Sequence, residues 1–383
     1  MRPIKKMTVL LLLAFPLMAL AQTGSERSSN EPFKVGTFEI DGVPRVGIVL
    51  RDSLIIDLYA ANTELQKNTA YPSIPLPADM IGLIERYDYG LKYRLYEIVN
   101  DLVDNNKLGG NHPEYVYAVD KVRTLPPIIY PGKILNAAVN FYSHVEESGT
   151  EVERMEARRQ RRENRGVPYL FLKPSRGVVI GNGDEIVIPY GRDRTDWEVE
   201  LGAVIGRKAK YVSANNAEDY IFGYMVTMDI SDRGRRPPGG NPLRSDWFVG
   251  KGHDTFAPQG PWIVPKEFYG NPMEKLRQTL SVGGEQMQEA TAGDMIHTLF
   301  ELVEYGSSIV TLFPGDVVNN GTSGGVGSGT AVRGEQRFLK PGDEVVATID
   351  GIGTLRMPVV GEEAPKGLTG AHLPPVNTYR DPQ

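Results

Sequence analysis

Short apolar runs separated by turn residues open the body of the chain. They cover residues 33–40, 44–50 and 53–58, with Asp41-Gly42 and Arg51-Asp52 between them. Apolar and β-branched residues bounded by such polar pairs are typical of strands joined by tight turns. The pattern predicts three short β-strands near the start of the protein.

A helical periodicity follows, and then strands return. Between residues 78 and 103 apolar side chains recur every three or four positions, and Asp79 precedes them as a candidate N-cap. From about residue 125 onward, short apolar runs alternate with Gly and Pro, which predicts a β-dominated α+β fold. The predicted divisions are an N-terminal α+β domain over residues 22–126, a main domain over 127–365 and a tail over 366–383.

Residues 1–21 have the pattern of a secretory signal peptide. Three basic residues precede an apolar run, which closes on Ala19-Leu20-Ala21, a small-x-small cleavage pattern. The alternative is a membrane anchor, but the apolar residues 8–20 span only about 20 Å as a helix, against a hydrocarbon core of ~30 Å. We expect cleavage and a secreted or periplasmic protein without membrane contact.

The amino-acid composition limits which catalytic groups and metal ligands the protein can use. The 383 residues contain no cysteine, five histidines, 42 Lys+Arg and 48 Asp+Glu, for a net charge of −6. Disulfides, a thiolate nucleophile and sulfur-ligated metals are therefore excluded. A mild acidic excess also argues against nucleic acid as a partner. Any metal site must use carboxylates or histidine.

Three acidic residues suit a hard cation. Glu198 and Glu200 alternate with apolar neighbours at period two, so a strand directs both carboxylates to one face. Asp229 ends the next apolar run. Three oxygen ligands on adjacent strands suit Mg²⁺ or Mn²⁺, whereas the alternative is a strand face whose acids meet water.

His144 and Glu147 are three positions apart, which makes them neighbours on one helical turn. A carboxylate beside an imidazole gives a competent general base for water, although a surface His–Glu contact has the same spacing. Lys251 lies between two glycines, so the backbone there can approach a ligand closely; the alternative is a solvated lysine.

Two further segments have two interpretations each. Residues 151–165 hold six Arg and four Glu, which fits either a solvated helix with ion pairs or a mobile lid. Residues 321–325 match G-x-S-x-G, but the glycines that follow are a poor start for the helix that a nucleophile elbow requires. The same turn can instead bring Thr322 and backbone N–H groups to a substrate oxygen.

Taken in order, short motifs from residue 130 to 360 resemble the fumarylacetoacetate hydrolase family. The most specific is Asp196-Trp-Glu-Val-Glu-Leu, followed by the run that ends in Asp229. The other matching segments are residues 133–136, 140–147, 169–174, 204–207, 223–233, 250–251, 256–262, 312–317, 321–327, 339–343 and 351–354.

The resemblance implies a core of mixed, rolled β-sheets behind a small N-terminal domain, and a homodimer. It places Glu198, Glu200 and Asp229 as ligands of a divalent cation, Mg²⁺ first and Mn²⁺ or Ca²⁺ next. It also implies that His144 and Glu147 form a lid-borne dyad. The positions that correspond to contacts with a substrate carboxylate or oxyanion are Arg233, Lys251 and Thr322.

We therefore expect a metal-dependent hydrolase that cleaves a C–C bond in an acylpyruvate-like or 1,3-diketo acid through a metal-stabilised enolate. Decarboxylases, hydratases and isomerases in this family use the same site and are the alternative. A secreted, non-catalytic binding protein is the third hypothesis. Arg236 stands where the family pattern has a glutamine, which favours a larger or more anionic substrate.

Overall fold

The computed structural model describes residues 28–147, 149–234, 246–334, 336–364 and residue 366. The predicted signal peptide, almost all of the predicted tail, and Arg236 lie outside the described residues. Among the described residues, no helix combines the length and apolar character needed to cross a lipid bilayer.

The three predicted N-terminal strands are confirmed as β1 (Lys34–Ile40), β2 (Val43–Leu50) and β3 (Leu54–Asp57). They pair antiparallel in that order. Asp41 and Gly42 in the first turn both have positive φ, at 53° and 75°, which explains the turn residues in the sequence. Two further short strands complete this unit, β4 (Val116–Ala118) and β5 (Arg123–Leu125).

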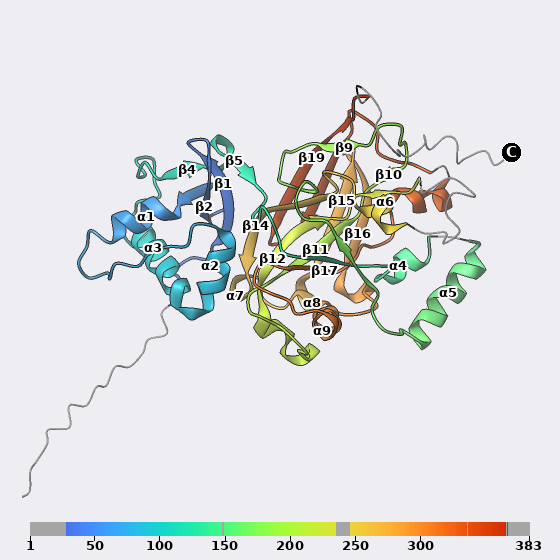
Figure 1. Cartoon of the computed structure of the whole chain (residues 1–383), viewed down its shortest axis with the longest axis horizontal. Coiled ribbons are helices and arrows are strands. Elements are labelled where there is room, and N and C mark those ends of the chain that lie inside the picture. Colours follow the sequence, from blue (N-terminus) through green and yellow to red (C-terminus); the bar gives the residue numbers. More distant parts are fainter. Residues whose placement is uncertain (1–27, 148, 235–245, 335, 365, 367–383) are drawn as a thin grey trace, which may run out of the picture.

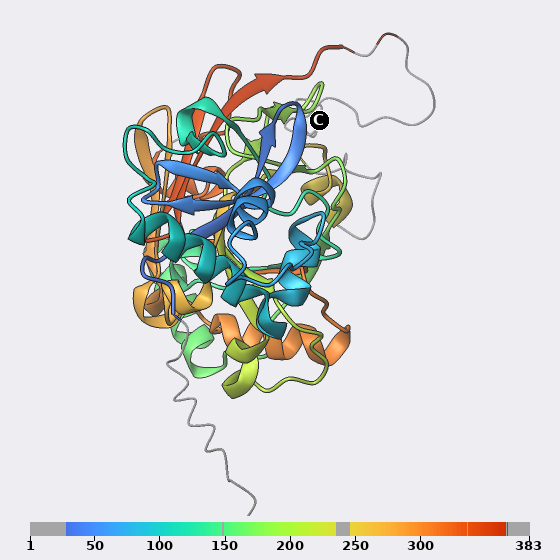
Figure 2. The ribbon, with the colours of Figure 1, turned by 90° about the vertical axis from the view of Figure 1, so that its left-hand side faces the viewer.

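The helical periodicity predicted over residues 78–103 is confirmed, but it is divided between two helices. The structure has α2 (Met80–Arg86), a π-helical turn over Tyr87–Leu91 and then α3 (Lys92–Asp104). The helix is interrupted because Gly90 adopts a φ of 112°, outside the helical region. Asp79 does cap α2, since its side chain accepts from Gly82 N at 2.9 Å. With α1 (Leu58–Leu65), these helices lie beside the blue strands (Figure 2).

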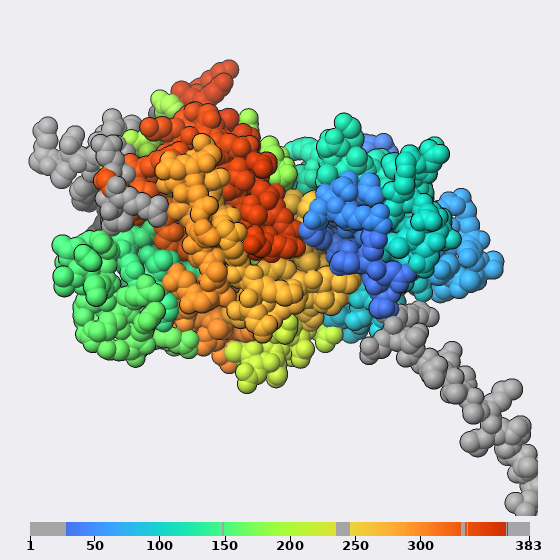
Figure 3. All heavy atoms as spheres, turned by 180° about the vertical axis from the view of Figure 1, so that it is seen from behind, coloured from blue at the N-terminus to red at the C-terminus, as the bar shows by residue number. Residues whose placement is uncertain are grey.

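One large sheet runs through both parts of the chain. Its strands follow the order β4-β3-β2-β1-β14-β12-β11-β17-β6-β7. The N-terminal unit joins the main domain where β1 pairs with β14, with Val35 opposite Ile263. Figure 1 shows this junction, and Figure 3 shows the two parts in contact from behind. The main-domain strands are β6 (Ile134–Ala137), β7 (Leu170–Lys173), β11 (Val199–Ile205), β12 (Ile221–Met228), β14 (Ala257–Pro265) and β17 (Val317–Asn319).

A second, five-stranded sheet packs against the first. Its order is β16-β15-β18-β19-β9, with β19 and β9 parallel and the other pairs antiparallel. The core between the sheets joins Leu201 and Val226 of the large sheet to Leu280 and Leu355 of the smaller one. This confirms the β-dominated α+β class with mixed sheets. The strands are β9 (Ile186–Ile188), β15 (Arg277–Val282), β16 (Glu285–Thr291), β18 (Glu344–Ile349) and β19 (Gly353–Gly361).

The remaining elements are short or peripheral. Helix α5 (Glu151–Glu163) lies at the edge of the main domain, far from the N-terminal unit (Figures 1 and 3), and none of its residues is buried. Arg159 pairs with Glu156 and Glu163 along it, as expected of a solvated, ion-paired helix. The others are β8 (Val179–Ile180), β10 (Thr195–Asp196), β13 (Ser231–Asp232), α4 (Tyr142–Val145), α6 (Trp247–Lys251), α7 (Lys266–Tyr269), α8 (Pro272–Lys275) and α9 (Leu299–Ile309).

Candidate active site

The three predicted metal ligands come together at one end of a strand pair. Glu198 precedes β11, Glu200 lies within it, and Asp229 directly follows β12. The two strands are antiparallel neighbours, and Asp229 N donates to Glu198 O at 2.9 Å. One oxygen from each carboxylate lies within 4.8 Å of the others, and all three residues are buried. The predicted alternative, a solvated acidic face, is therefore wrong.

Two buried lysines contact this cluster. Lys251, at the end of α6, places Nζ 2.9 Å from Glu198 Oε2 and 2.5 Å from Asp229 Oδ2. Lys173, at the end of β7, forms an ion pair with Asp229 and donates to Ile230 O at 2.9 Å. Both lysine side chains are buried, so the alternative of a solvated Lys251 is wrong. A buried charge requires partners such as these carboxylates.

The carboxylates have different electrostatic environments. Burial raises the pKa of Glu200 well above its usual range, and the charges of Asp229 and Glu198 raise it further. Burial also opposes ionisation of Glu198, but Lys251 and Arg233 outweigh it and lower that pKa to about 2. Within the described part of the chain Glu200 forms no ion pair; its Oε2 accepts from Asn136 Nδ2 at 3.0 Å.

A divalent cation fits this donor set. All three candidate ligands are buried carboxylates, the oxygen type that Mg²⁺, Mn²⁺ and Ca²⁺ prefer. Asn136 Oδ1 is also buried without a hydrogen-bond partner beside Glu200. A cation held here would supply the positive charge that Glu200 lacks.

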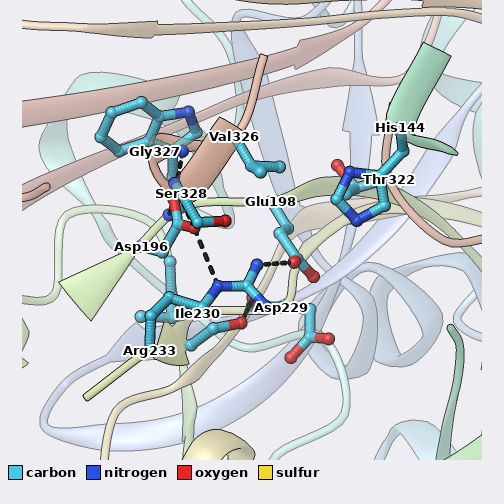
Figure 4. A network of polar contacts seen from close by, with 12 residues as sticks. His144, Asp196, Glu198, Asp229, Ile230, Arg233, Thr322, Val326, Gly327 and Ser328 are labelled. Atoms are coloured by element: carbon cyan, nitrogen blue, oxygen red, sulfur yellow. Dashed lines mark hydrogen bonds and ion pairs between the residues drawn. The ribbon is translucent and has the colours of Figure 1, made fainter. Parts of the chain in front are cut away.

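The His–Glu dyad forms as the spacing predicted. His144 Nδ1 hydrogen-bonds to Glu147 Oε2, and the side chains are only 17% and 12% exposed, so the pair is not a surface contact. Glu147 Oε1 accepts from the backbone N–H groups of Gly325 and Val326. Figure 4 shows His144 and Arg233 on either side of Glu198. The carboxylate thus orients the imidazole while the glycine-rich loop holds the carboxylate.

The proposed substrate contacts differ in what they can offer. Arg233 follows β13; its Nε lies 2.9 Å from Asp196 Oδ2, and its Nη2 pairs with Glu198. The Thr322 hydroxyl donates to Val199 O at 2.9 Å and accepts from Gln288 at 2.8 Å. Its proton is therefore already used inside the protein. The structure does not describe Arg236.

The nucleophile-elbow interpretation of residues 321–325 is not supported by the geometry. Ser323 Oγ contacts the Gly324 carbonyl at 3.3 Å rather than a histidine. The segment leads into a 3₁₀ helix over Gly327–Arg333 instead of the helix that an elbow requires.

Two buried charged residues received no role from the sequence alone. Lys173 closes the apolar run Leu170-Phe-Leu, and Asp196 precedes Trp197-Glu198. A charged residue that ends an apolar run is the signal that could have marked Lys173, whereas Asp196 follows a polar stretch and has no such signal. Burial lowers the pKa of Lys173, against the opposing charge of Asp229.

Comparison with known proteins identifies the class. The model of the fumarylacetoacetate (FAA) hydrolase C-terminal domain family matches residues 133–360. The chain belongs to this family, and it is an enzyme of a class that contains hydrolases and isomerases. The resemblance expected from the sequence is thereby confirmed.

Individual relatives differ in their named reactions. A 2,4-didehydro-3-deoxy-L-rhamnonate hydrolase from Sphingomonas sp. (strain SKA58) is 35% identical over 233 residues, 61% of this chain and 75% of that protein. The maleylpyruvate hydrolase structure from Sphingobium sp. SYK-6 has a TM-score of 0.60 at 26% identity. A 5-carboxymethyl-2-hydroxymuconate delta-isomerase from Mycobacterium smegmatis has 0.59, also at 26%. Each alignment covers 86% of this chain and 100% of the other.

Proposed function

We propose that this protein is a divalent-metal-dependent hydrolase that cleaves a C–C bond in an acylpyruvate-like or 1,3-diketo acid. The observation that carries the proposal is the buried Glu198, Glu200 and Asp229 cluster, with His144 of the His144–Glu147 dyad beside Glu198 (Figure 4). A maleylpyruvate hydrolase of the same fold has been determined with manganese(II) and pyruvate, which supports the metal and the substrate class.

Each group has a defined task in this reaction. Glu198, Glu200 and Asp229 would hold the cation, which when bound stabilises negative charge developing on the substrate oxygens. His144, oriented by Glu147, takes a proton from water at Nε2. Arg233 and Lys251 would stabilise the substrate carboxylate and the enolate leaving group, Lys251 by giving up one of its three present partners, Glu198, Asp229 and Ser231. Burial strengthens all these interactions because little water screens them.

An isomerase is the second candidate, because a structure of this fold at 26% identity is a delta-isomerase. The same dyad can move a proton between substrate carbons instead of activating water. Decarboxylase and hydratase reactions at the same site are the remaining alternatives. A binding protein without catalysis would need neither the part-buried imidazole of His144 nor the carboxylate of Glu147 that the loop holds.

A metal-supplemented screen over acylpyruvates, diketo acids and oxaloacetate, with mass analysis of products, tests the proposal. Hydrolysis adds one water and yields two fragments, whereas isomerisation leaves the mass unchanged and decarboxylation releases CO₂. We expect turnover with Mg²⁺ or Mn²⁺ and none with EDTA. Two fragments support the hydrolase; turnover that persists in EDTA would contradict the metal dependence.

We further propose that the protein is exported and that it forms a homodimer. The basic start, the apolar run and the Ala19-Leu20-Ala21 site support export. We expect the mature protein to begin at Gln22. Its mass, measured by light scattering, should be twice that of one chain. N-terminal sequencing that recovers Met1, or a monomer mass, would contradict the respective part.

A further inference from the structure

One loop presents four consecutive backbone N–H groups to two carboxylates. Gly325 and Val326 donate to Glu147, the dyad carboxylate. The next two N–H groups, of Gly327 and Ser328, donate to Asp196 at 2.5 and 3.0 Å. The loop therefore links the dyad to a second acidic residue, for which the proposed mechanism has no task.

Asp196 is saturated with donors. It is fully buried. Oδ1 accepts from Trp197 N at 2.8 Å and from Gly327 N, and Oδ2 accepts from Ser328 N and from Arg233 Nε at 2.9 Å. All four partners donate, so the carboxylate is held in one orientation. Figure 4 shows it next to the loop, on the opposite side of Arg233 from Glu198.

Arg233 is held at two points, and part of its side chain is exposed. Nε contacts Asp196 and Nη2 contacts Glu198, while the side chain is 26% exposed. Within the described residues Nη1 makes no hydrogen bond. A guanidinium anchored in this way offers a fixed N–H edge to a carboxylate, without the entropy cost of ordering a free arginine.

We propose that Asp196 is a positioning residue that aims Arg233 at the carboxylate of a 2-oxo acid bound beside the acidic cluster. The inference rests on the proposed function for its substrate class. The loop that holds Asp196 also holds Glu147 through the N–H groups of Gly325 and Val326. The same loop therefore positions both Arg233 and the His144–Glu147 dyad.

Asp196→Asn tests the inference without changing the size of the side chain. Each carboxylate oxygen accepts from two donors, so the new amide NH₂ must face two donors in either orientation. We expect the KM for a 2-oxo acid and the Kd for oxalate to rise about 10–100-fold. Mg²⁺ affinity, measured by calorimetry, should change by less than about threefold, because the ligands remain.

Asp232→Asn is the matched control. Asp232 is also buried and lies in the same two-stranded ribbon, opposite Thr195, but it pairs with Arg192, with 2.6 Å between Arg192 Nε and Asp232 Oδ2. This substitution removes a second buried Asp–Arg pair, in which Asp232 contacts none of the three cluster carboxylates among the described residues. If Asp232→Asn weakened oxalate binding as much as Asp196→Asn does, Asp196 would contribute only to the stability of the fold. That result would overturn the proposal.

A double-mutant cycle separates positioning from general destabilisation. If Asp196 acts through Arg233, Asp196→Asn should add less than about threefold to the oxalate Kd in an Arg233→Lys background. Additive effects would overturn the inference. If Asp196→Asn does not fold, Asp196→Glu, which keeps the charge but moves the acceptor, should weaken oxalate binding in the same direction.

The failure of the two proposals can be told apart. If the wild type binds Mg²⁺ and oxalate but turns over no compound of the screen, the proposed reaction is wrong, and the oxalate comparison still decides on Asp196. If the wild type turns over a 2-oxo acid and Asp196→Asn leaves its KM and the oxalate Kd unchanged, only the positioning role is wrong. If the metal-loaded wild type neither binds oxalate nor turns over any compound of the screen, both proposals fall.

Discussion

Replacing Glu200 with Gln is expected to abolish turnover and to weaken divalent-metal binding together. The change keeps the shape of the side chain but removes one of three carboxylates whose oxygens lie within 4.8 Å. Because the cation contributes several kcal/mol to the proposed reaction, kcat/KM should fall by about a thousandfold or more. Activity assays and Mg²⁺ titration by calorimetry measure the two effects.

The same variant should be at least as stable as the wild type when metal is absent. The folded protein raises the pKa of Glu200 through burial and like charges, so ionised Glu200 destabilises the fold above its unfolded pKa. A neutral Gln removes that cost at pH 7. Thermal unfolding in EDTA compares the stability of the variant with that of the wild type. The control is Glu289→Gln, which removes a carboxylate from an exposed ion pair with Arg277. Wild-type activity in Glu200→Gln would end the metal-site assignment.

Replacing His144 with Asn is expected to lower kcat while leaving metal binding intact. The imidazole is the proposed base, and loss of a general base typically costs about 10²–10⁴-fold in rate. Its ring does not belong to the carboxylate cluster, so the Mg²⁺ affinity should stay within about threefold. Steady-state kinetics at saturating metal and calorimetry distinguish the two quantities.

Two variants check the assignment of the dyad. Glu147→Gln should lower kcat less than His144→Asn does, because it only disturbs the orientation of the ring. His112→Asn replaces an exposed histidine of the N-terminal unit and should change nothing. If His144→Asn kept the wild-type kcat, water activation would need another base.

Much of the site was predictable from local pattern. Period-two alternation around Glu198 and Glu200 specifies a strand with both carboxylates on one face, and the apolar run before Asp229 specifies its neighbour. The three-residue spacing of His144 and Glu147 predicts that the two side chains meet, as they do, although Glu147 lies just beyond α4. These predictions hold because each depends on the geometry of a single segment.

Other features depended on contacts between distant segments. Lys173 reaches Asp229 across 56 positions, and the loop at Gly325 reaches Glu147 across 178. No local pattern encodes such pairs, since they follow from the strand order of the large sheet. Local pattern can also mislead. The apolar periodicity continues across Gly90, where the backbone leaves the helical conformation.

By itself, the sequence determined the chemical character of this protein: oxygen ligands without cysteine, an imidazole paired with a carboxylate, and strands that carry acids at their ends. The tertiary structure decided how those charges are balanced. It pairs Glu198 and Asp229 with lysine and arginine side chains, gives Glu200 no ion pair among the described residues, and anchors Arg233 on Asp196. The physical reason is that burial and electrostatic energy depend on distances in space, which residues far apart in the chain set only when they fold together.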